Sequence, residues 1–190
     1  MKQPKTAPPF AFDDSLAEYN QSAKTWLSRN ASQVRLDGIA TSTLIFNANG
    51  KVLLVQRAST DSMPNKWEAP GGAVDSEDAS ILHGAAREMW EESGLVARRF
   101  VCRVTLGPGS PDLDIFHNST RTRCLCRFAF LVEAESCEGV QLDAKEHQAH
   151  VWATEEQVRE QRQVTMTNSS MQALVLEAFR LRREEQETTA

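Results

Sequence analysis

The sequence lacks any long run of apolar residues. No stretch approaches the about 18 consecutive apolar residues that a membrane-spanning helix requires. The N-terminal segment 1–12 is rich in proline and polar residues and lacks the apolar core of a secretory signal. We therefore expect no membrane partner and a cytoplasmic location.

Cysteines and basic residues are present, but the cysteines lack the spacing of a metal site and the basic residues are not clustered. The four cysteines show neither zinc-site spacing nor a CxxC pair, so we interpret them as free thiols of a reducing compartment such as the cytosol. The 21 Lys and Arg residues are outnumbered by 26 Asp and Glu residues and form no extended basic patch. Nucleic acid is therefore not expected as a partner.

One acidic segment, residues 70–95, reads PGGAVDSEDASILHGAAREMWEESGL. A Pro-Gly-Gly turn opens it, an acidic loop follows, and a helical pattern ends at Gly94. On a helix, residues three and four apart are neighbours, so Glu88, Glu91 and Glu92 share one side. That side is either a solvated acidic face or a site for a hard cation such as Mg²⁺, which prefers oxygen ligands. The paired glycines allow a ligand to approach the backbone closely and favour the second interpretation.

The same segment resembles the Nudix box of the Nudix hydrolase superfamily, which includes MutT-like proteins. That box reads Gly, five residues, Glu, seven residues, Arg-Glu, an apolar residue, any residue, Glu-Glu, any residue, Gly, apolar. Residues 87–95 (REMWEESGL) match its second half without a gap. In the first half Asp78 replaces the glutamate, and eight residues rather than seven separate it from Arg87. We interpret this as one extra residue at the start of the helix and leave Asp78 out of the predicted metal ligands.

The alternation of strand and helix patterns indicates an α/β or α+β domain. The Nudix resemblance implies a three-layer α/β/α sandwich around a mixed β-sheet. We expect a partly helical N-terminal extension at 1–34, the Nudix domain at 35–184 and a frayed tail at 185–190. Strands are predicted at 36–46 and 52–56, joined as a hairpin by the Asn-Gly turn at 47–50, and further on at 96–106 and 121–132. Residues 139–143 and 150–153 are predicted to be short strands or connecting pieces.

Helices are predicted around 22–28, over 79–93, after Thr154, and near the C-terminus up to about 182. Residues 107–120, rich in proline and glycine, are predicted to form a long loop of the kind that often binds ligands. Helix caps are predicted at Ser76 or Asp78, at Thr154, and at Thr167 or Asn168.

The resemblance also implies a reaction, the hydrolysis of a nucleoside diphosphate linked to a second moiety, with Mg²⁺ as cofactor and Mn²⁺ able to replace it. Carried over residue by residue, Glu88, Glu91 and Glu92 are the predicted metal ligands. Glu91, Glu92 and Glu146 are the candidates for the general base. Arg87 is expected to hold the box loop and orient a glutamate. The alternatives are a surface ion pair between Arg87 and Glu91, and a solvated loop position for Glu146.

Four residues are predicted to contact the substrate: Arg57, Trp67, Gly71 and Gly72. A plain surface arginine and a core tryptophan are the alternatives for the first two, and His147 is interpreted as an ordinary surface or structural histidine. The expected substrate is a small diphosphate such as an oxidised nucleotide, a nucleotide sugar or ADP-ribose, hydrolysed by a monomer or homodimer. The competing interpretation is a non-catalytic Nudix-fold module that binds or regulates.

Overall fold

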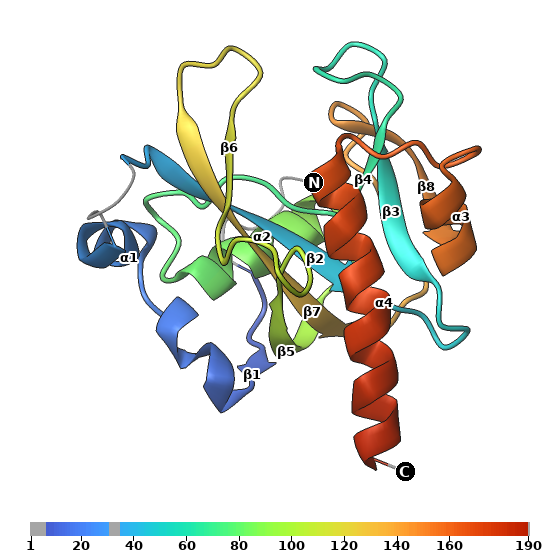
Figure 1. Cartoon of the computed structure of the whole chain (residues 1–190), viewed down its shortest axis with the longest axis horizontal. Coiled ribbons are helices and arrows are strands. Elements are labelled where there is room, and N and C mark those ends of the chain that lie inside the picture. The colour runs from blue at the N-terminus through green and yellow to red at the C-terminus, as the bar shows by residue number, and fades with distance from the viewer. Residues whose placement is uncertain (1–6, 31–34, 190) are drawn as a thin grey trace.

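The strands form two β-sheets in the computed structural model, which describes residues 7–30 and 35–189 (Figure 1). The five strands of the larger sheet are β1 (Ala11–Phe12), β5 (Ala97–Val104), β7 (Cys124–Ala134), β2 (Gly38–Ile45) and β6 (Asp114–His117), which pairs with β7. The smaller sheet consists of β4 (Trp67–Glu68), β3 (Val52–Arg57) and β8 (His147–Ala153). The β1–β5 and β2–β7 pairs are parallel and the β5–β7 pair is antiparallel, so the predicted mixed sheet is confirmed.

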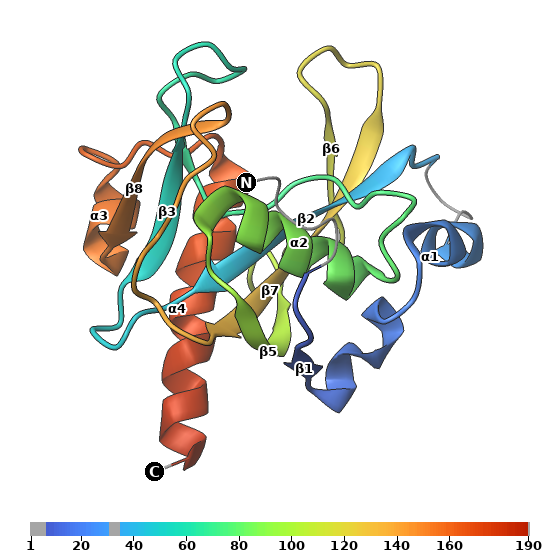
Figure 2. The ribbon, with the colours of Figure 1, turned by 180° about the vertical axis from the view of Figure 1, so that it is seen from behind.

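Helices cover both faces of the larger sheet. Figure 1 shows α4 (Ser169–Thr189) in front of the strands, and Figure 2, seen from behind, shows α2 (Ile81–Ser93) on the opposite face. The N-terminal helices η1 (Asp14–Tyr19) and α1 (Ala23–Asn30) share a hydrophobic core with α2, and the short α3 (Glu155–Glu160) contacts α4. This is the three-layer arrangement that was predicted. Within the described part of the chain, no helix has the length and apolar character needed to cross a bilayer.

The predicted hairpin of residues 36–46 and 52–56 is present only at its turn, where Phe46 and Val52 form an antiparallel bridge, and is wrong for the rest of the two strands. The Asn-Gly turn is present, with Gly50 in the left-handed region at φ 72°, but it carries the chain from one sheet to the other. β2 pairs in parallel with β7, whereas β3 pairs with β4 and β8. Nearly all of β2 is buried, although it is the last strand in the order of the larger sheet, which suits a strand covered on both faces better than one arm of an exposed hairpin.

Two further predictions on the second half of the chain need correction. The predicted loop 107–120 contains strand β6, because Asp114–His117 pairs with the N-terminal half of β7. Residues 139–143 form a connecting segment, the second of the two predicted alternatives, and the strand predicted at 150–153 is β8, which begins earlier, at His147. Strand β6 and the start of β8 are stabilised by pairing with strands that are distant in the sequence, and local sequence patterns do not reveal such pairing.

The N-terminal extension is part of the domain core. Trp26 is buried and Leu27 packs against the same cluster, and β1 adds a parallel strand to the edge of β5. Residues 7–14 include β1, while 1–6 lie outside the described residues. At the other end, α4 extends to Thr189 instead of ending near residue 182, so most of the predicted tail is helical.

Candidate active site

Helix α2 carries the acidic residues of the box and is capped at both ends. Ser80 accepts a hydrogen bond from the backbone N–H of His83, so the helix begins at Ile81 and not at residue 79, and neither Ser76 nor Asp78 is the cap. Gly94 ends it in the left-handed conformation, as predicted. The helix is regular from Ile81 onward, so the extra residue of the box lies in the preceding loop.

The buried guanidinium of Arg87 holds that loop against the helix. It donates two hydrogen bonds to the Asp78 carboxylate, both 2.9 Å, and one of 3.0 Å to the backbone oxygen of Ala73. Its Nη1 donates to Glu88 and Glu91, each at 2.9 Å. The hydrogen bond with Asp78 is the largest cause that raises the pKa of Arg87 above its ordinary value. Asp78 therefore belongs to this clamp, which accounts for the acidic residue retained at the start of the box.

The Gly71–Gly72 turn lies between strand β2 and helix α2. The Gly71 N–H donates to Glu92 Oε2 at 2.7 Å, while Gly72 O accepts from the Thr41 N–H at 2.8 Å. A Cβ atom on Gly71 would lie 2.1 Å from the Thr41 carbonyl oxygen, and one on Gly72 would lie 2.7 Å from the Glu88 carboxylate. Only glycine fits at position 71, where the clash is with backbone, and a side chain at position 72 would displace the Glu88 carboxylate. The turn thereby brings the backbone directly against the acidic side of α2.

Two of the box glutamates are removed from water. Glu92 is 5% exposed, and burial raises its pKa well above the ordinary value although the Gly71 N–H lowers it. Burial also raises the pKa of Glu88, to about 7, against the opposing charge of Arg87. Glu91 differs from both, since 36% of its side chain is exposed and its carboxylate is paired with Arg87. The acidic side therefore contains carboxylates whose charged forms need a further positive partner.

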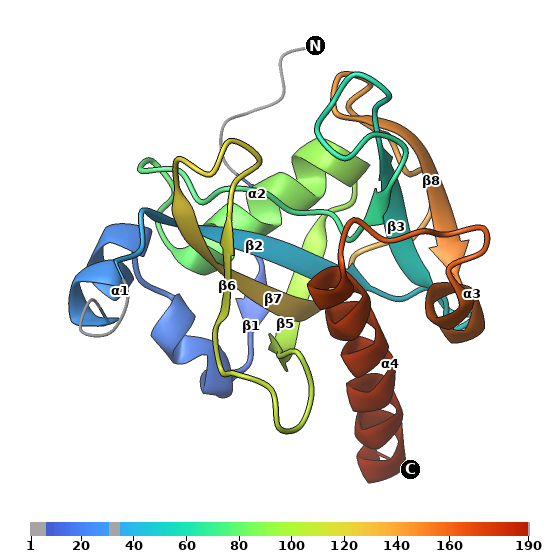
Figure 3. The same cartoon turned by 45° about the horizontal axis from the view of Figure 1, so that its top comes forward.

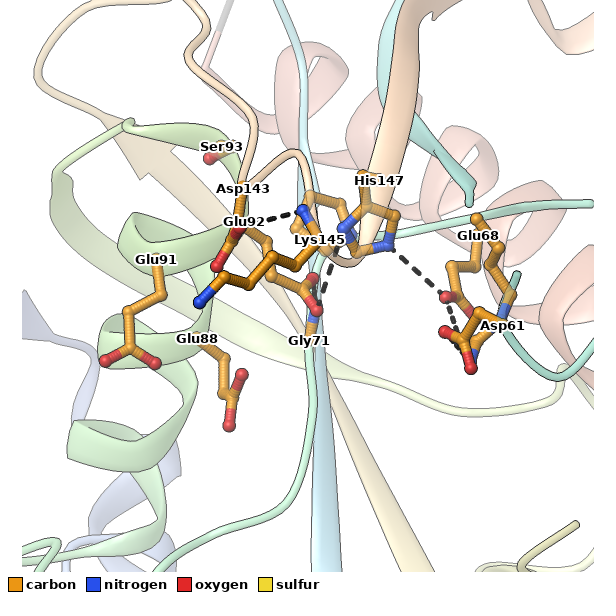
Figure 4. Close-up of polar contacts among 12 residues, drawn as sticks. Asp61, Glu68, Gly71, Glu88, Glu91, Glu92, Ser93, Asp143, Lys145 and His147 are labelled. Carbon is orange, nitrogen blue, oxygen red and sulfur yellow. Dashed lines mark hydrogen bonds and ion pairs between the residues drawn. The ribbon is translucent and has the colours of Figure 1, made fainter. Parts of the chain in front are cut away.

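The start of β8 brings a second set of side chains to this helix (Figure 4). Buried His147 lies between two carboxylates, with Nδ1 4.0 Å from Glu92 Oε1 and Nε2 3.5 Å from Glu68 Oε1. Neither ring nitrogen has a hydrogen-bond partner among the residues that the structure describes. Glu92, Glu146 and His147 each offer one ligand atom, and these atoms lie within 4.8 Å of one another. We call these three residues the acidic cluster; its geometry can hold a metal ion.

Glu146 thus approaches the box helix. His147 is buried, which agrees with the structural rather than the surface alternative, and Glu68 was not singled out from the sequence. Both positions follow from the pairing of β3 with β4 on one side and β8 on the other. The one local signal was that Glu68 immediately precedes the Ala-Pro-Gly-Gly run.

A cavity of about 570 Å³ opens beside the Gly-Gly turn, with Gly71, Gly72, Glu68 and Arg57 among its lining residues. The Arg57 guanidinium is already engaged, by Glu68 at 2.5 Å and by Asp61 at 2.6 Å. The Trp67 indole packs on the core beneath α4, and Trp67 is not one of the described residues that line this cavity. Contacts of Arg57 and Trp67 with a substrate stay predictions.

Residues 37–174 match the family model of the NUDIX domain. The chain belongs to the Nudix family. It is 26% identical to a MutT-like protein of Streptomyces ambofaciens over 132 residues, which are 70% of this chain and 73% of that protein. It is also 43% identical to human m7GpppN-mRNA hydrolase NUDT17 over 58 residues. That match covers 30% of this Nudix chain and only 17% of the human protein.

Solved structures show the same fold. The MutT protein from Methanosarcina mazei Go1 superposes with a TM-score of 0.54 at 24% identity, covering 82% of this chain and 99% of that one. A C. elegans Ap4A hydrolase gives a TM-score of 0.56 at 20% identity, covering 78% and 98%. The predicted fold and membership of the Nudix pyrophosphohydrolase family are therefore confirmed.

Proposed function

We propose that this Nudix protein hydrolyses the pyrophosphate bond of a nucleoside diphosphate linked to a second moiety, with Mg²⁺ as cofactor and Mn²⁺ able to replace it. The observation that carries the proposal is the acidic cluster beside the Gly-Gly turn. Glu92 is buried and close to Glu146, and His147 offers ring nitrogens that find no hydrogen bond within residues 7–30 and 35–189. A cation would supply the positive charge that Glu88 and Glu92 need in order to ionise at neutral pH.

The residues proposed to hold the cation are Glu88, Glu91 and Glu92. Glu146 and His147 lie near enough to Glu92 to complete its shell. Arg87 has a positioning role, because its hydrogen bond fixes the Glu88 carboxylate while its others fix the loop. When bound, a divalent cation polarises phosphoryl oxygens and makes water a better nucleophile near neutral pH.

Glu146 is the proposed general base. It is exposed and comes from the loop before β8, so its carboxylate can approach an attacking water from a different side than the α2 glutamates. Its own backbone fixes this loop, since Glu146 O accepts from the Ala58 N–H at 2.8 Å and Glu146 N donates to Asp143 O at 3.0 Å. Glu91 and Glu92 stay the alternatives for the general base. Glu91 is partly exposed but paired with Arg87, and Glu92 is buried.

The names of two relatives support a nucleotide substrate, since an mRNA-cap hydrolase and an Ap4A hydrolase both act on phosphate-bridged nucleosides. Oxidised nucleotides, nucleotide sugars and ADP-ribose all fit the proposed class. A role as a non-catalytic binding or regulatory module is the second candidate. It is disfavoured by the buried, like-charged carboxylates, which serve no evident purpose without a cation.

One screen tests the proposal. Purified protein is incubated with nucleoside triphosphates, dinucleoside polyphosphates, nucleotide sugars and ADP-ribose, with Mg²⁺ or Mn²⁺ and then with excess EDTA. We expect cleavage of at least one compound that EDTA abolishes and added Mg²⁺ restores. The variant Glu92→Gln should need more Mg²⁺ for this activity, whereas replacing Glu18, an exposed carboxylate in η1, by Gln should leave the requirement unchanged. Turnover that persists in EDTA would contradict the proposal, and absence of any turnover would favour the binding module.

A further inference from the structure

The cavity beside the Gly-Gly turn contains two hydrogen-bonding side chains with atoms to spare. Arg127 of β7 is 9% exposed, and Thr167 precedes α4. In the described residues, neither Arg127 Nη1 nor Thr167 Oγ1 has a hydrogen-bond partner. Figure 3 shows the β6–β7 hairpin and the start of α4, which provide these residues, on the same side of the molecule. A buried polar atom without a partner is unfavourable, and a ligand in the cavity could supply the missing partners.

The helix cap explains why the threonine is free. Thr167 and Asn168 were both candidates to cap the last helix, and Asn168 takes the role by accepting from the Met171 N–H at 2.8 Å. The Thr167 backbone N–H donates to Trp67 O at 2.9 Å, which fixes its position between β4 and α4. Thr167 therefore lines the cavity, and its buried hydroxyl is not used to cap the helix.

The surroundings of Arg127 do not suit a phosphate group. Its Nε lies 3.5 Å from Asp114 Oδ2, directly across the β6–β7 pair, and Glu68 lines the same cavity. A phosphate bound by Arg127 would meet the negative charge of these carboxylates. The Phe116 ring lies 4.7 Å from the guanidinium carbon, and Leu125 and Met171 also line the cavity. These groups suit a flat, uncharged ring, such as a nucleobase.

We propose that Arg127 and Thr167 recognise the base of the substrate and select 6-oxopurines, such as guanine and hypoxanthine. This inference rests on the proposed function, because it places the nucleoside part of the diphosphate in this cavity. An arginine provides donors in a fork that matches the acceptors O6 and N7 of a 6-oxopurine. Adenine presents an amino donor in place of O6, which would face the guanidinium and leave Arg127 Nη1 without an acceptor. The Thr167 hydroxyl can donate to a further acceptor on the ring.

The test compares GTP, ITP and ATP as substrates by kcat/KM. We expect GTP and ITP to be similar, because both carry O6 and N7, and each to exceed ATP by about 5- to 150-fold, the range for one good bidentate contact. In Arg127→Lys, which keeps a positive charge beside Asp114 but loses the planar fork, the GTP-to-ATP ratio should fall toward one. The change should appear mainly in KM for GTP. Thr167→Val should lower the ratio less.

The matched control is Arg103→Lys. Arg103 also lies over aromatic rings, 5.3 Å from the Phe128 centroid, but is not one of the described residues lining the cavity. Its GTP-to-ATP ratio should equal that of the wild type. If Arg127→Lys does not fold, the double variant Arg127→Gln with Asp114→Asn removes both charges together and should give the same loss of selectivity. Equal wild-type rates with GTP and ATP, or an unchanged ratio in the Arg127 variants, would overturn the inference.

A binding measurement separates this inference from the proposed reaction. GMP and AMP are titrated into wild type and Arg127→Lys by calorimetry. If no compound is hydrolysed but GMP binds at least about 5-fold more tightly than AMP, and only when Arg127 is present, the base site stands while the reaction fails. If GMP and AMP bind equally, or neither binds, the base site is refuted, whatever the enzyme hydrolyses.

Discussion

Helix α2 carries charged residues of two groups, one around Arg87 and one around Glu92, and the two groups are arranged in opposite ways. Around Arg87, donors and acceptors match, since the guanidinium binds Asp78, Ala73 O, Glu88 and Glu91. Around Glu92 they do not. His147 lies 4.0 Å away with ring nitrogens that lack hydrogen bonds in the described structure, and Glu88 and Glu146 add negative charge.

This contrast separates residues that hold the fold together from residues that are expected to bind a cation. A buried arginine with matched partners holds two chain segments together, and losing it leaves carboxylates unpaired. A buried carboxylate with mismatched neighbours destabilises the ligand-free protein and gains its partner only when a cation binds. Four predictions test this division, in order of decreasing expected effect.

The largest effect is expected for Glu146→Gln. If Glu146 takes the proton from the attacking water, kcat should fall by about 10²–10⁴-fold, while the Mg²⁺ concentration for half-maximal rate stays nearly the same. Steady-state kinetics over a Mg²⁺ titration measure both quantities. Wild-type kcat at saturating substrate and metal would remove Glu146 from the reaction and leave Glu91 or Glu92 as the base.

Replacing Arg87 with Met should cost about 3–5 kcal/mol of unfolding free energy in metal-free protein, because Asp78 and Glu88 remain buried without their partner. Urea denaturation measures the change. The control is Arg98→Met, whose side chain is 64% exposed and pairs with Glu133, and which should cost less than about 1 kcal/mol. A similar loss in both variants would mean that the Arg87 clamp is no more than a surface ion pair.

Neutralising a glutamate that lacks a matched partner should weaken metal binding without lowering the stability of the metal-free protein. Glu88→Gln and Glu92→Gln should each raise the Mg²⁺ requirement by at least about tenfold, given that even outer-shell partners contribute about 10–100-fold to metal affinity. For Glu92→Gln the metal-free melting temperature should stay the same or rise, since burial opposes the charge of Glu92. Thermal melts with and without Mg²⁺ give both results. A marked drop in the metal-free melting temperature would show that Glu92 is structural.

The smallest effect is expected for Glu91→Gln. Glu91 pairs with Arg87 one helical turn away, and its side chain is 36% exposed, so the metal-free protein should lose only about 0.2–0.5 kcal/mol. The Mg²⁺ titration of this variant decides whether Glu91 is also a ligand. A shift as large as that of Glu92→Gln would place it in the metal shell, and an unchanged titration would confine it to the clamp.

Much of the helix that carries the site was predictable because its information is local. The spacing of Glu88, Glu91 and Glu92, the stop at Gly94 and the paired glycines all lie within one short segment. The start of α2 was missed because Asp78, a good capping residue, is taken by Arg87, and Ser80 becomes the cap. A competition between two hydrogen-bond partners is decided by three-dimensional proximity, which sequence spacing does not reveal.

The sequence by itself determined the helix of the box and its glutamates, because these depend on residue type and helical periodicity. The resemblance of its motif to the Nudix box implied the family and the three-layer architecture. Only the tertiary structure decided which other side chains lie next to these glutamates. It separated β2 from β3, paired β3 with β8, and so placed His147 between Glu68 and Glu92. It likewise gathered Arg127 and Thr167 around one cavity. The physical reason is that strand pairing is a contact between distant segments, and its partners are chosen by burial across the whole core rather than by any local pattern.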